Sequence, residues 1–434
     1  MTGCGSWSWP ALLAPLLLGV AAAPAAVAVA ASGGPALAAA DDAPRLHAEP
    51  ASTRGSLLPI VVNTWAGPCF GGATAAAWAT LQAGGSGLDA VERGCSHAEA
   101  QRCDRTVGYG GSPDESGETS LDALIMDGGT MRAGAVANLR RVRQAASAAR
   151  LVMERTRHSL LAGEEATAFA ADMGLQPQGS LATAESRAVW RKWVEGRCQP
   201  NFRQGVAPDA TLSCGPYRPL PGNSSSSSSS SRGQDLTNTA ALELLERHGQ
   251  QGMQQVQQDE QQWPSVVAHD TIAMVAVTAD GAVAAGASSN GAIHKVPGRV
   301  GDAAVPGGGA YADSEVGGCG STGDGDTHIA FLPCYQVVEA MRRGLSPQAA
   351  AEDAVRRIAR RVPSYVGAVV AVSKDGRYGA AAHGWKFVFS VASAASSGQV
   401  ETIAVEPLAV QAAAEQPARA VAIQSQRHGA SVAV

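Results

Sequence analysis

Thr271 has the position of a candidate nucleophile, because it stands where a glutamine-rich tract gives way to an apolar run. It follows His269 and Asp270 and opens the run 271–277. A threonine hydroxyl attacks poorly without a nearby base, but its own α-amino group, with a pKa of about 8, would be such a base once it is free. Freeing that group requires cleavage of the peptide bond before Thr271. The other interpretation, which this triplet alone favours, is an ordinary first residue of a strand.

Three motifs further along the chain would complete such a site. Residues 288–291 (Ser-Ser-Asn-Gly) end the return strand of a predicted hairpin, and hairpin geometry would bring them beside Thr271. Arg299 and Asp302 stand around a glycine and would suit a zwitterion, with the arginine binding a carboxylate and the aspartate an ammonium. The turn 322–326 (Thr-Gly-Asp-Gly-Asp) precedes a helix and offers N–H groups to an oxyanion. A surface ion pair and a plain helix cap are the alternatives for the last two motifs.

Patterns of apolar residues predict the elements that would position these side chains. Ser346 before Pro347 is typical of a helix start. The order of strands and helices indicates sheets covered by helices in layers. The predicted strands are 58–63, 119–127, 271–277, 282–288, 366–372 and 378–382, with hairpin turns at Asp280-Gly281 and Asp375-Gly376. The predicted helices are 73–82, 88–99, 135–155, 164–173, 184–194, 240–247, 328–343 and 347–361, and 290–326 is predicted to be a glycine-rich loop.

Residues 1–40 have the composition of a cleaved secretory presequence. An apolar stretch runs from 12 to 31, the first charged residue is Asp41, and small residues at 38–40 offer a cleavage site. An N-terminal membrane anchor is the alternative, which the prolines and the weakly hydrophobic alanines disfavour. Nothing else in the sequence is long and apolar enough to span a bilayer, so we expect no stable membrane insertion after the presequence is removed.

Residues 216–265 form an insertion of low complexity. It contains eight consecutive serines at 224–231 and a glutamine-rich tract that ends at Trp263. Because such tracts bury little apolar surface, we predict a flexible linker here.

The overall composition excludes several classes of protein. The chain has 434 residues, of which 45% are hydrophobic and 16% charged, so it can fill a large core and is not disordered throughout. Its net charge of -5 shows no basic surplus, and no nucleic-acid partner is expected. The sequence has no CxxC motif and no His/Cys cluster with zinc spacing, so neither a metal nor a cofactor is expected.

The chain has eight cysteines, of which seven remain after the presequence. An odd number leaves at least one free thiol or one bond between molecules. Cys198 and Cys214 bracket a short polar loop and are the best disulfide candidates in an oxidising compartment. Cys95 and Cys103 could also pair.

Together these motifs resemble those of the aspartylglucosaminidases, also called glycosylasparaginases, which are N-terminal-nucleophile hydrolases. The resemblance covers roughly 57–383 and is interrupted by the serine/glutamine insertion. The segments that carry it are 61–65 (VVNTW), 110–115 (GGSPDE), 269–272 (HDTI), 298–302 (GRVGD), 306–313 and 322–326 (TGDGD).

The resemblance implies an α+β fold, a four-layer αββα sandwich. It also implies that the precursor cleaves itself between Asp270 and Thr271 by an N-to-O acyl shift. An α chain (41–270) and a β chain (271–434) would then stay together, in some relatives as a dimer of such pairs. The implied activity is hydrolysis of the amide bond between N-acetylglucosamine and L-asparagine, through an aspartyl ester on Thr271.

The resemblance also assigns roles to individual residues. Ser289 stands where the family usually has threonine, and it keeps the hydroxyl that steadies the nucleophile. His269 and Asp270 would strain and activate the scissile bond. Arg299 would hold the α-carboxylate of the substrate and Asp302 its α-amino group. Thr322 and Gly323 would form the oxyanion hole, and Trp65 would line the cleft. The expected substrate-binding set is Trp65, Arg299, Val300, Gly301, Asp302, Thr322, Gly323, Asp324 and Gly325.

The cysteines follow the family pattern only in part. Cys198 and Cys214 fit a family pair, whereas Ala98 stands where a partner for Cys103 would be expected. Cys319, close before Thr322, is predicted to be a free thiol.

Two other functions remain as alternatives. A β-aspartyl peptidase or L-asparaginase would use the same threonine on a different leaving group, although the His-Asp before Thr271 and the Asn-Gly after Ser289 favour the sugar-linked substrate. An unprocessed, secreted homologue would act without catalysis. We expect the secretory pathway, with lysosome, vacuole and extracellular space not separable.

Overall fold

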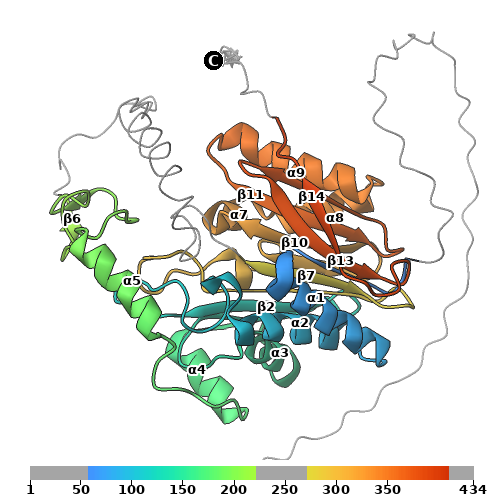
Figure 1. The fold of residues 1–434 in the computed structure, drawn as a ribbon, viewed down its shortest axis with the longest axis horizontal. Helices are drawn as coiled ribbons and strands as arrows, with labels where there is room; N and C mark the ends of the chain where they lie inside the picture. Colours follow the sequence, from blue (N-terminus) through green and yellow to red (C-terminus); the bar gives the residue numbers. More distant parts are fainter. Residues whose placement is uncertain (1–56, 221–270, 410–434) are drawn as a thin grey trace, which may run out of the picture. The chain divides into compact units, whose positions relative to one another are not determined.

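The computed structural model describes residues 57–220 and 271–409, and in it two sheets lie between helices (Figure 1). The larger sheet has the strand order β14-β13-β1-β7-β8-β2-β3-β4, and the smaller sheet the order β12-β11-β10-β9. The larger sheet consists of β1 (Ile60–Asn63), β2 (Leu121–Asp127), β3 (Arg132–Leu139), β4 (Leu160–Ala162), β7 (Ile272–Val277), β8 (Val283–Ser289), β13 (Phe387–Ser393) and β14 (Glu401–Val405). The smaller sheet consists of β9 (Ala310–Asp313), β10 (Gly317–Gly323), β11 (Gly367–Ser373) and β12 (Tyr378–His383).

Helices cover the outer faces of both sheets (Figure 1). Against the larger sheet pack α1 (Gly67–Gln82), α2 (Gly87–Gln101) and α3 (Ala145–Arg155), and against the smaller sheet α8 (Pro333–Arg342) and α9 (Pro347–Arg361). The remaining elements are α4 (Gly163–Asp172), α5 (Ala184–Glu195), the pair β5 (Val206–Ala207) and β6 (Arg218–Pro219), α7 (Gly325–Phe331), and the short 3₁₀ turns at Cys103–Arg105 and Asp302–Ala304.

The alternation of side chains along each strand explains the layers. In β7, Ile272 and Met274 pack against the helices, while Ala273 and Val275 face the smaller sheet. Strand β11 continues the same pattern, with one set of residues between the sheets and the other against α8 and α9. The structure therefore has four layers: helices, the larger sheet, the smaller sheet and helices. An apolar cluster lies between each layer and the next. The predicted α+β, four-layer αββα sandwich is confirmed.

Most of the predicted elements are present, with ends that differ by a few residues. The hairpin around Asp280-Gly281 forms between β7 and β8, and the helix at 347–361 is α9. Ser346 caps it, because its Oγ accepts the N–H of Ala349 at 3.3 Å. Helix α1 begins six residues before the predicted start, at Gly67 followed by Pro68.

The predicted helix at 135–155 is wrong in its first half. Residues Arg132–Leu139 form β3, which pairs with β2, and only Ala145–Arg155 is helical. Alanine and arginine favour helix locally, but pairing with β2 and packing under α3 decide the structure.

The stretch 290–343 also differs from its prediction. Two strands, β9 and β10, lie inside the predicted glycine-rich loop. The helix predicted at 328–343 is divided into α7 and α8 at Leu332, which has a φ of 51° and precedes Pro333. Proline disfavours helical backbone in the residue before it, so the break falls there.

Some predictions lie outside the described residues. These are the presequence at 1–40, most of the 216–265 insertion including the helix at 240–247, and the processing residues His269 and Asp270.

Within the described residues two disulfides form. One joins Cys198 to Cys214, the pair that the sequence favoured. The other joins Cys69 to Cys103, so the suggested pairing of Cys95 with Cys103 is wrong, and so is the idea that Cys103 lacks a partner. Cys95 is unpaired and buried in the core on α2, whereas Cys103 lies beyond the end of that helix. Cys319 is a free thiol, as predicted.

The Cys69→Ser variant is expected to unfold with a free energy about 3–4 kcal/mol lower than the wild type, because the Cys69–Cys103 bond restricts the unfolded chain over a separation of 34 residues. Denaturant unfolding of both oxidised proteins measures this difference. In the presence of a reductant the two proteins should unfold alike. A gap that persisted there would assign the loss to packing instead of the cross-link.

Candidate active site

Thr271 lies immediately before β7, and its main chain is held on both sides. The residue is 1% exposed. Its N–H donates to Thr322 Oγ1 over 3.1 Å, and its carbonyl oxygen accepts from Thr64 Oγ1 and Trp65 Nε1, each at 3.1 Å. Thr322 belongs to β10 of the smaller sheet and the other two residues follow β1 of the larger sheet. Both sheets therefore contribute to the fixation of this one residue.

The segment after β1 is itself rigidly held. Thr64 Oγ1 also accepts the N–H of Ala273 at 2.9 Å, so one hydroxyl binds the main chain of the strand at two points. Asn63 Oδ1 accepts the N–H of Trp65 at 3.2 Å. The indole N–H of Trp65 also reaches Thr322 Oγ1 at 3.2 Å. The end of the motif at 61–65 thus fixes the start of β7 by hydrogen bonds to its main chain.

Ser289 closes β8 on the other side of Thr271. Strands β7 and β8 are antiparallel with Ile272 opposite Ser288, and the same register places Ser289 opposite Thr271. Ser289 is 2% exposed, and its Oγ accepts the N–H of Gly291 at 2.8 Å. That bond uses a lone pair of the hydroxyl and leaves its proton for a neighbour.

Thr322 can act as a hydrogen-bond donor toward the space beside Thr271. Its Oγ1 accepts two N–H groups, from Thr271 and from Trp65. A hydroxyl with both lone pairs engaged still has its own proton to donate. This is the capacity that a developing oxyanion requires.

Gly323 follows in a backbone conformation that favours glycine. Its φ is +119°, and a Cβ atom placed there would lie 2.5 Å from both Gly367 Cα and the carbonyl oxygen of Val366. Asp324 then caps α7 by accepting the N–H of Thr327 at 3.1 Å. The close approach of β11 therefore fixes the turn from β10 into α7.

Arg299 and Asp302 converge on one small residue, Gly325. A Cβ atom placed on Gly325 would lie 2.8 Å from Asp302 Oδ1 and 3.1 Å from Arg299 Nη2, so both charges border the same space. The Arg299 side chain is 13% exposed and binds Asp326 at 2.8 Å. Asp326 is 60% exposed, so a ligand carboxylate could replace it on the guanidinium. A cation and an anion placed in this way suit a zwitterion.

Asp302 keeps its charge although it is buried. Burial alone would raise the pKa of its carboxyl group, but the hydrogen bond with His328 and the nearby charge of Arg299 hold that pKa below its ordinary value. The Nδ1 atom of His328 lies 2.7 Å from Asp302 Oδ2. A buried carboxylate that stays ionised is the partner that an ammonium group needs.

Comparison with known proteins identifies the family of this chain. The sequence model of the family described as Asparaginase matches residues 63–402. The chain belongs to the asparaginase family. The resemblance inferred from the motifs is therefore confirmed.

Three curated members show how far the likeness to asparaginase-family proteins extends. A protein of Arabidopsis thaliana named "Probable isoaspartyl peptidase/L-asparaginase 3" is 47% identical over 347 residues, which is 79% of this chain and 90% of that protein. Proteins named N(4)-(beta-N-acetylglucosaminyl)-L-asparaginase are 41% identical over 375 residues in Rattus norvegicus (86% of this chain, 90% of that protein) and 45% over 329 residues in Mus musculus (76% and 85%).

The structure of this asparaginase-family protein brings together most of the residues that the motifs suggested. Thr271, Ser289, Thr322 and Trp65 form one group, and Arg299, Asp302 and Gly325 form a second. Gly323 and Asp324 connect the two groups along the chain, and the Asp324 carboxylate binds Thr327. Val300 is half-buried and packs against the layer between the sheets, and Gly301 is buried. The motif at 110–115 belongs to neither group. Its loop packs on the segment after β8, where the N–H of Glu115 donates to the carbonyl of Lys295 at 3.0 Å.

Two buried charged residues at the site escaped the sequence analysis. Asp122 in β2 is 0% exposed and accepts the N–H groups of Gly301 and Asn138, each at 2.8 Å. Lys295 is 1% exposed, donates to the carbonyl of Asn290, and has its pKa lowered to about 8 by burial. A single aspartate inside the apolar run 121–126 was the available signal for Asp122. No feature of the sequence around Lys295 indicated that this lysine would be buried.

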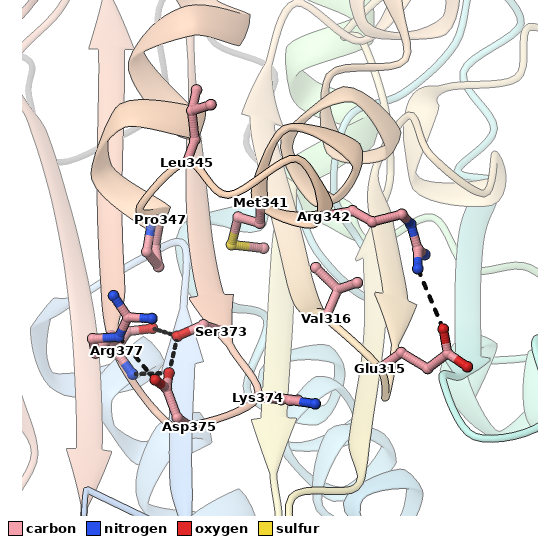
Figure 2. Close-up of a pocket in the computed structure, with 10 residues that line it drawn as sticks. All are labelled: Glu315, Val316, Met341, Arg342, Leu345, Pro347, Ser373, Lys374, Asp375 and Arg377. Atoms are coloured by element: carbon pink, nitrogen blue, oxygen red, sulfur yellow. Dashed lines mark hydrogen bonds and ion pairs between the residues drawn. The ribbon is translucent and has the colours of Figure 1, made fainter. Parts of the chain in front are cut away.

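A cavity of about 320 Å³ lies at the other end of β10, away from the site (Figure 2). Val316 and Lys374 border it, together with the ends of α8 and α9. Figure 2 shows two ion pairs among the residues that line it, Arg377 with Asp375 at 2.9 Å and Arg342 with Glu315 at 3.4 Å. A strand of seven residues spans roughly 20 Å, so this cavity is separate from the group around Thr271.

Proposed function

We propose that this chain hydrolyses the amide bond between N-acetylglucosamine and L-asparagine in glycoasparagines. The observation that carries the proposal is the position of Thr271, held by both sheets, opposite the Ser289 hydroxyl and next to the strand that leads to the zwitterion site at Gly325. The names of the rat and mouse relatives agree with this activity.

Self-cleavage comes first in the proposed sequence of events. The Thr271 hydroxyl attacks the carbonyl carbon of Asp270, so that an ester replaces the peptide bond, and water then hydrolyses this ester. The cleaved precursor consists of an α chain (41–270) and a β chain (271–434), with 216–265 as an insertion in the first. Strand β1 of the α chain pairs with β7 and β13 of the β chain, and β2 of the α chain pairs with β8 of the β chain, so hydrogen bonds between strands would hold the two chains together after cleavage.

Turnover then uses the new α-amino group of Thr271 as the base. This amine takes the proton of the hydroxyl, and the oxygen attacks the side-chain amide carbon of the substrate. Thr322 and Gly323 stabilise the oxyanion, and the glycosylamine leaves with a proton. Water hydrolyses the aspartyl ester and releases L-aspartate.

The zwitterion site holds the amino-acid part of the substrate during these steps. Arg299 binds the α-carboxylate and Asp302 the α-ammonium group, with Val300, Gly301, Asp324 and Gly325 shaping the space between them. Trp65 lines the cleft, and its ring meets that of Trp385 edge-on with the ring centroids 5.3 Å apart.

The second candidate activity is that of a β-aspartyl peptidase or L-asparaginase, which the name of the Arabidopsis relative favours. It requires the same aspartyl site and differs only in the leaving group. We expect kcat/KM for N-acetylglucosaminyl-asparagine to exceed that for β-aspartyl dipeptides and L-asparagine by at least about tenfold. Steady-state kinetics on all three substrates measure this, and the opposite order would assign the chain to the second activity.

An unprocessed, non-catalytic protein is the remaining alternative. Sequencing of the purified protein separates it from the enzyme. The enzyme gives two bands on a denaturing gel, and one fragment begins Thr-Ile-Ala-Met. A single intact band without turnover would favour the non-catalytic alternative.

We place the protein in the secretory pathway, with lysosome, vacuole or extracellular space as its destination. The disulfides Cys69–Cys103 and Cys198–Cys214 support an oxidising compartment. In the described ranges, no helix is long and apolar enough to cross a membrane. Paired α and β chains, in a dimer of such pairs, are the assembly we propose.

A further inference from the structure

A buried histidine lies between Asp302 of the zwitterion site and Tyr365, which comes just before β11. The proposed mechanism does not use this histidine. His328 lies in α7 and is 0% exposed. Its Nδ1 lies 2.7 Å from Asp302 Oδ2, and its Nε2 lies 2.8 Å from the hydroxyl of Tyr365. Tyr365 is 1% exposed. The three side chains form a continuous hydrogen-bonded line that is closed to solvent.

The two oxygens of Asp302 have different surroundings. Within residues 57–220 and 271–409, the hydrogen bonds to this carboxylate fall on Oδ2, which contacts His328 at 2.7 Å and accepts from Ser321 Oγ at 3.3 Å. The other oxygen, Oδ1, borders the space over Gly325 next to the guanidinium of Arg299. His328 therefore holds one oxygen and leaves the other facing the space that the ligand would occupy.

The surroundings of His328 determine which of its nitrogens faces which partner. An ionised carboxylate only accepts hydrogen bonds, so Nδ1 is the donor toward Asp302, and Nε2 faces the Tyr365 hydroxyl, which holds the ring in that orientation. Tyr365 is itself anchored, because its carbonyl oxygen lies 2.6 Å from His383 Nδ1. Tyr365 thus orients the His328 ring, and His328 supplies the donor to Asp302.

We propose that His328, oriented by Tyr365, is a positioning residue that fixes the Asp302 carboxylate for the α-ammonium group of the substrate. This inference rests on the proposed function, in which Asp302 binds that group. A hydrogen bond to a buried charge is strong, and its loss leaves the carboxylate without its main donor. His328 does not touch the substrate, so its effect should appear only with ligands that carry an α-amino group.

L-aspartate and succinate are the probes that separate this role from a general structural one. They share both carboxylates and differ in the α-amino group. Their dissociation constants are measured by calorimetry on the cleaved, purified protein. His328→Leu is expected to weaken L-aspartate binding about 10- to 100-fold and to change succinate binding less than about threefold. The KM for glycosylasparagine should rise by a similar factor, with a smaller change in kcat.

Two milder variants cover the case in which the leucine variant does not fold. His328→Asn keeps an N–H donor near the position of Nδ1 and should retain L-aspartate affinity within about fivefold of the wild type. Tyr365→Phe removes one hydroxyl and should weaken L-aspartate about 3- to 10-fold, with succinate unchanged. Equal losses for the two ligands in these variants would overturn the proposal, because a structural defect would affect both.

The wild-type protein separates failure of this inference from failure of the proposed function. A wild type that does not prefer L-aspartate to succinate contradicts an ammonium site at Asp302, and both proposals fall. A wild type that shows the preference, with a folded His328→Leu variant that keeps it, overturns only the role of His328.

Discussion

The Thr271→Ala variant is expected to remain one uncleaved polypeptide without measurable turnover of glycosylasparagine. In the proposed mechanism the Thr271 oxygen attacks the preceding peptide bond, so alanine would prevent that cleavage and the α-amino base would never be freed. Turnover should fall by about 10⁴-fold or more, because nucleophile and base are lost together. A denaturing gel reports the cleavage, and release of L-aspartate reports the turnover.

Two further variants make this result specific to the hydroxyl of Thr271. Thr271→Ser keeps the attacking oxygen and should retain part of both activities. Thr278→Ala makes the same change at the other end of β7, where the hydroxyl bonds locally to Asp280 and Ala282. This control should be cleaved and active like the wild type. Efficient cleavage or full activity in Thr271→Ala would remove the residue from the nucleophile position.

Features that depend on neighbouring residues could be predicted from the sequence. The Asp280-Gly281 turn and the Ser346 cap each involve a few consecutive positions, and both form as expected. The site motifs around Thr271 could be found for a similar reason, because each motif is continuous in sequence. The family resemblance then assigned their roles.

Strand β3 could not be predicted, because its cause is distant in the chain. The alanines at the start of 135–155 favour a helix, but Ala123 and Ile125 of β2 pair with Val136 and Gly134. A Cβ atom on Gly134 would lie 2.2 Å from the carbonyl oxygen of Ala149, so α3 packs directly on this glycine. Contact between elements, and not local propensity, decides the structure there.

Strand β10 was hidden for the opposite reason, because its glycines indicated a loop. They serve to bring the two sheets together. A Cβ atom on Gly318 would lie 2.7 Å from Val275 Cγ1, and one on Gly320 would lie 2.8 Å from the Cβ of Ala273. The glycine-rich sequence therefore lets β10 lie close enough to β7 for Thr322 to bond Thr271.

The supporting residues of the site needed the structure for the same reason. Asp122 and Gly301 are separated by 179 positions, and no periodicity links them. Asp302 and His328 are separated by 26 positions and meet only because α7 turns back over the 3₁₀ turn at Asp302–Ala304. The residues proposed to touch the substrate were therefore accessible from motifs, whereas those that hold them in place were not.

Gly323→Ala is expected to lower kcat for glycosylasparagine by about 100-fold or more. A φ of +119° is strained for alanine, and its Cβ would lie 2.5 Å from Gly367 Cα and from the carbonyl oxygen of Val366. Both are main-chain atoms of the neighbouring chain segment and cannot move aside like a side chain. The end of β10 must therefore shift. In the proposed mechanism this shift misaligns one oxyanion donor, and the loss of such a donor costs about 10²- to 10³-fold in kcat.

Gly344→Ala is the matched control for this second prediction. Gly344 also has a positive φ, of +98°, but a Cβ atom placed there meets nothing within 4 Å. This variant carries the backbone strain, of about 1–2 kcal/mol, without the displacement at β10, and its kcat should stay near that of the wild type. Kinetics on the cleaved fraction of both variants isolate the chemical step from processing. If Gly323→Ala turned over substrate as fast as Gly344→Ala, the oxyanion would have to be stabilised elsewhere, because the geometry of β10 would then not limit the reaction.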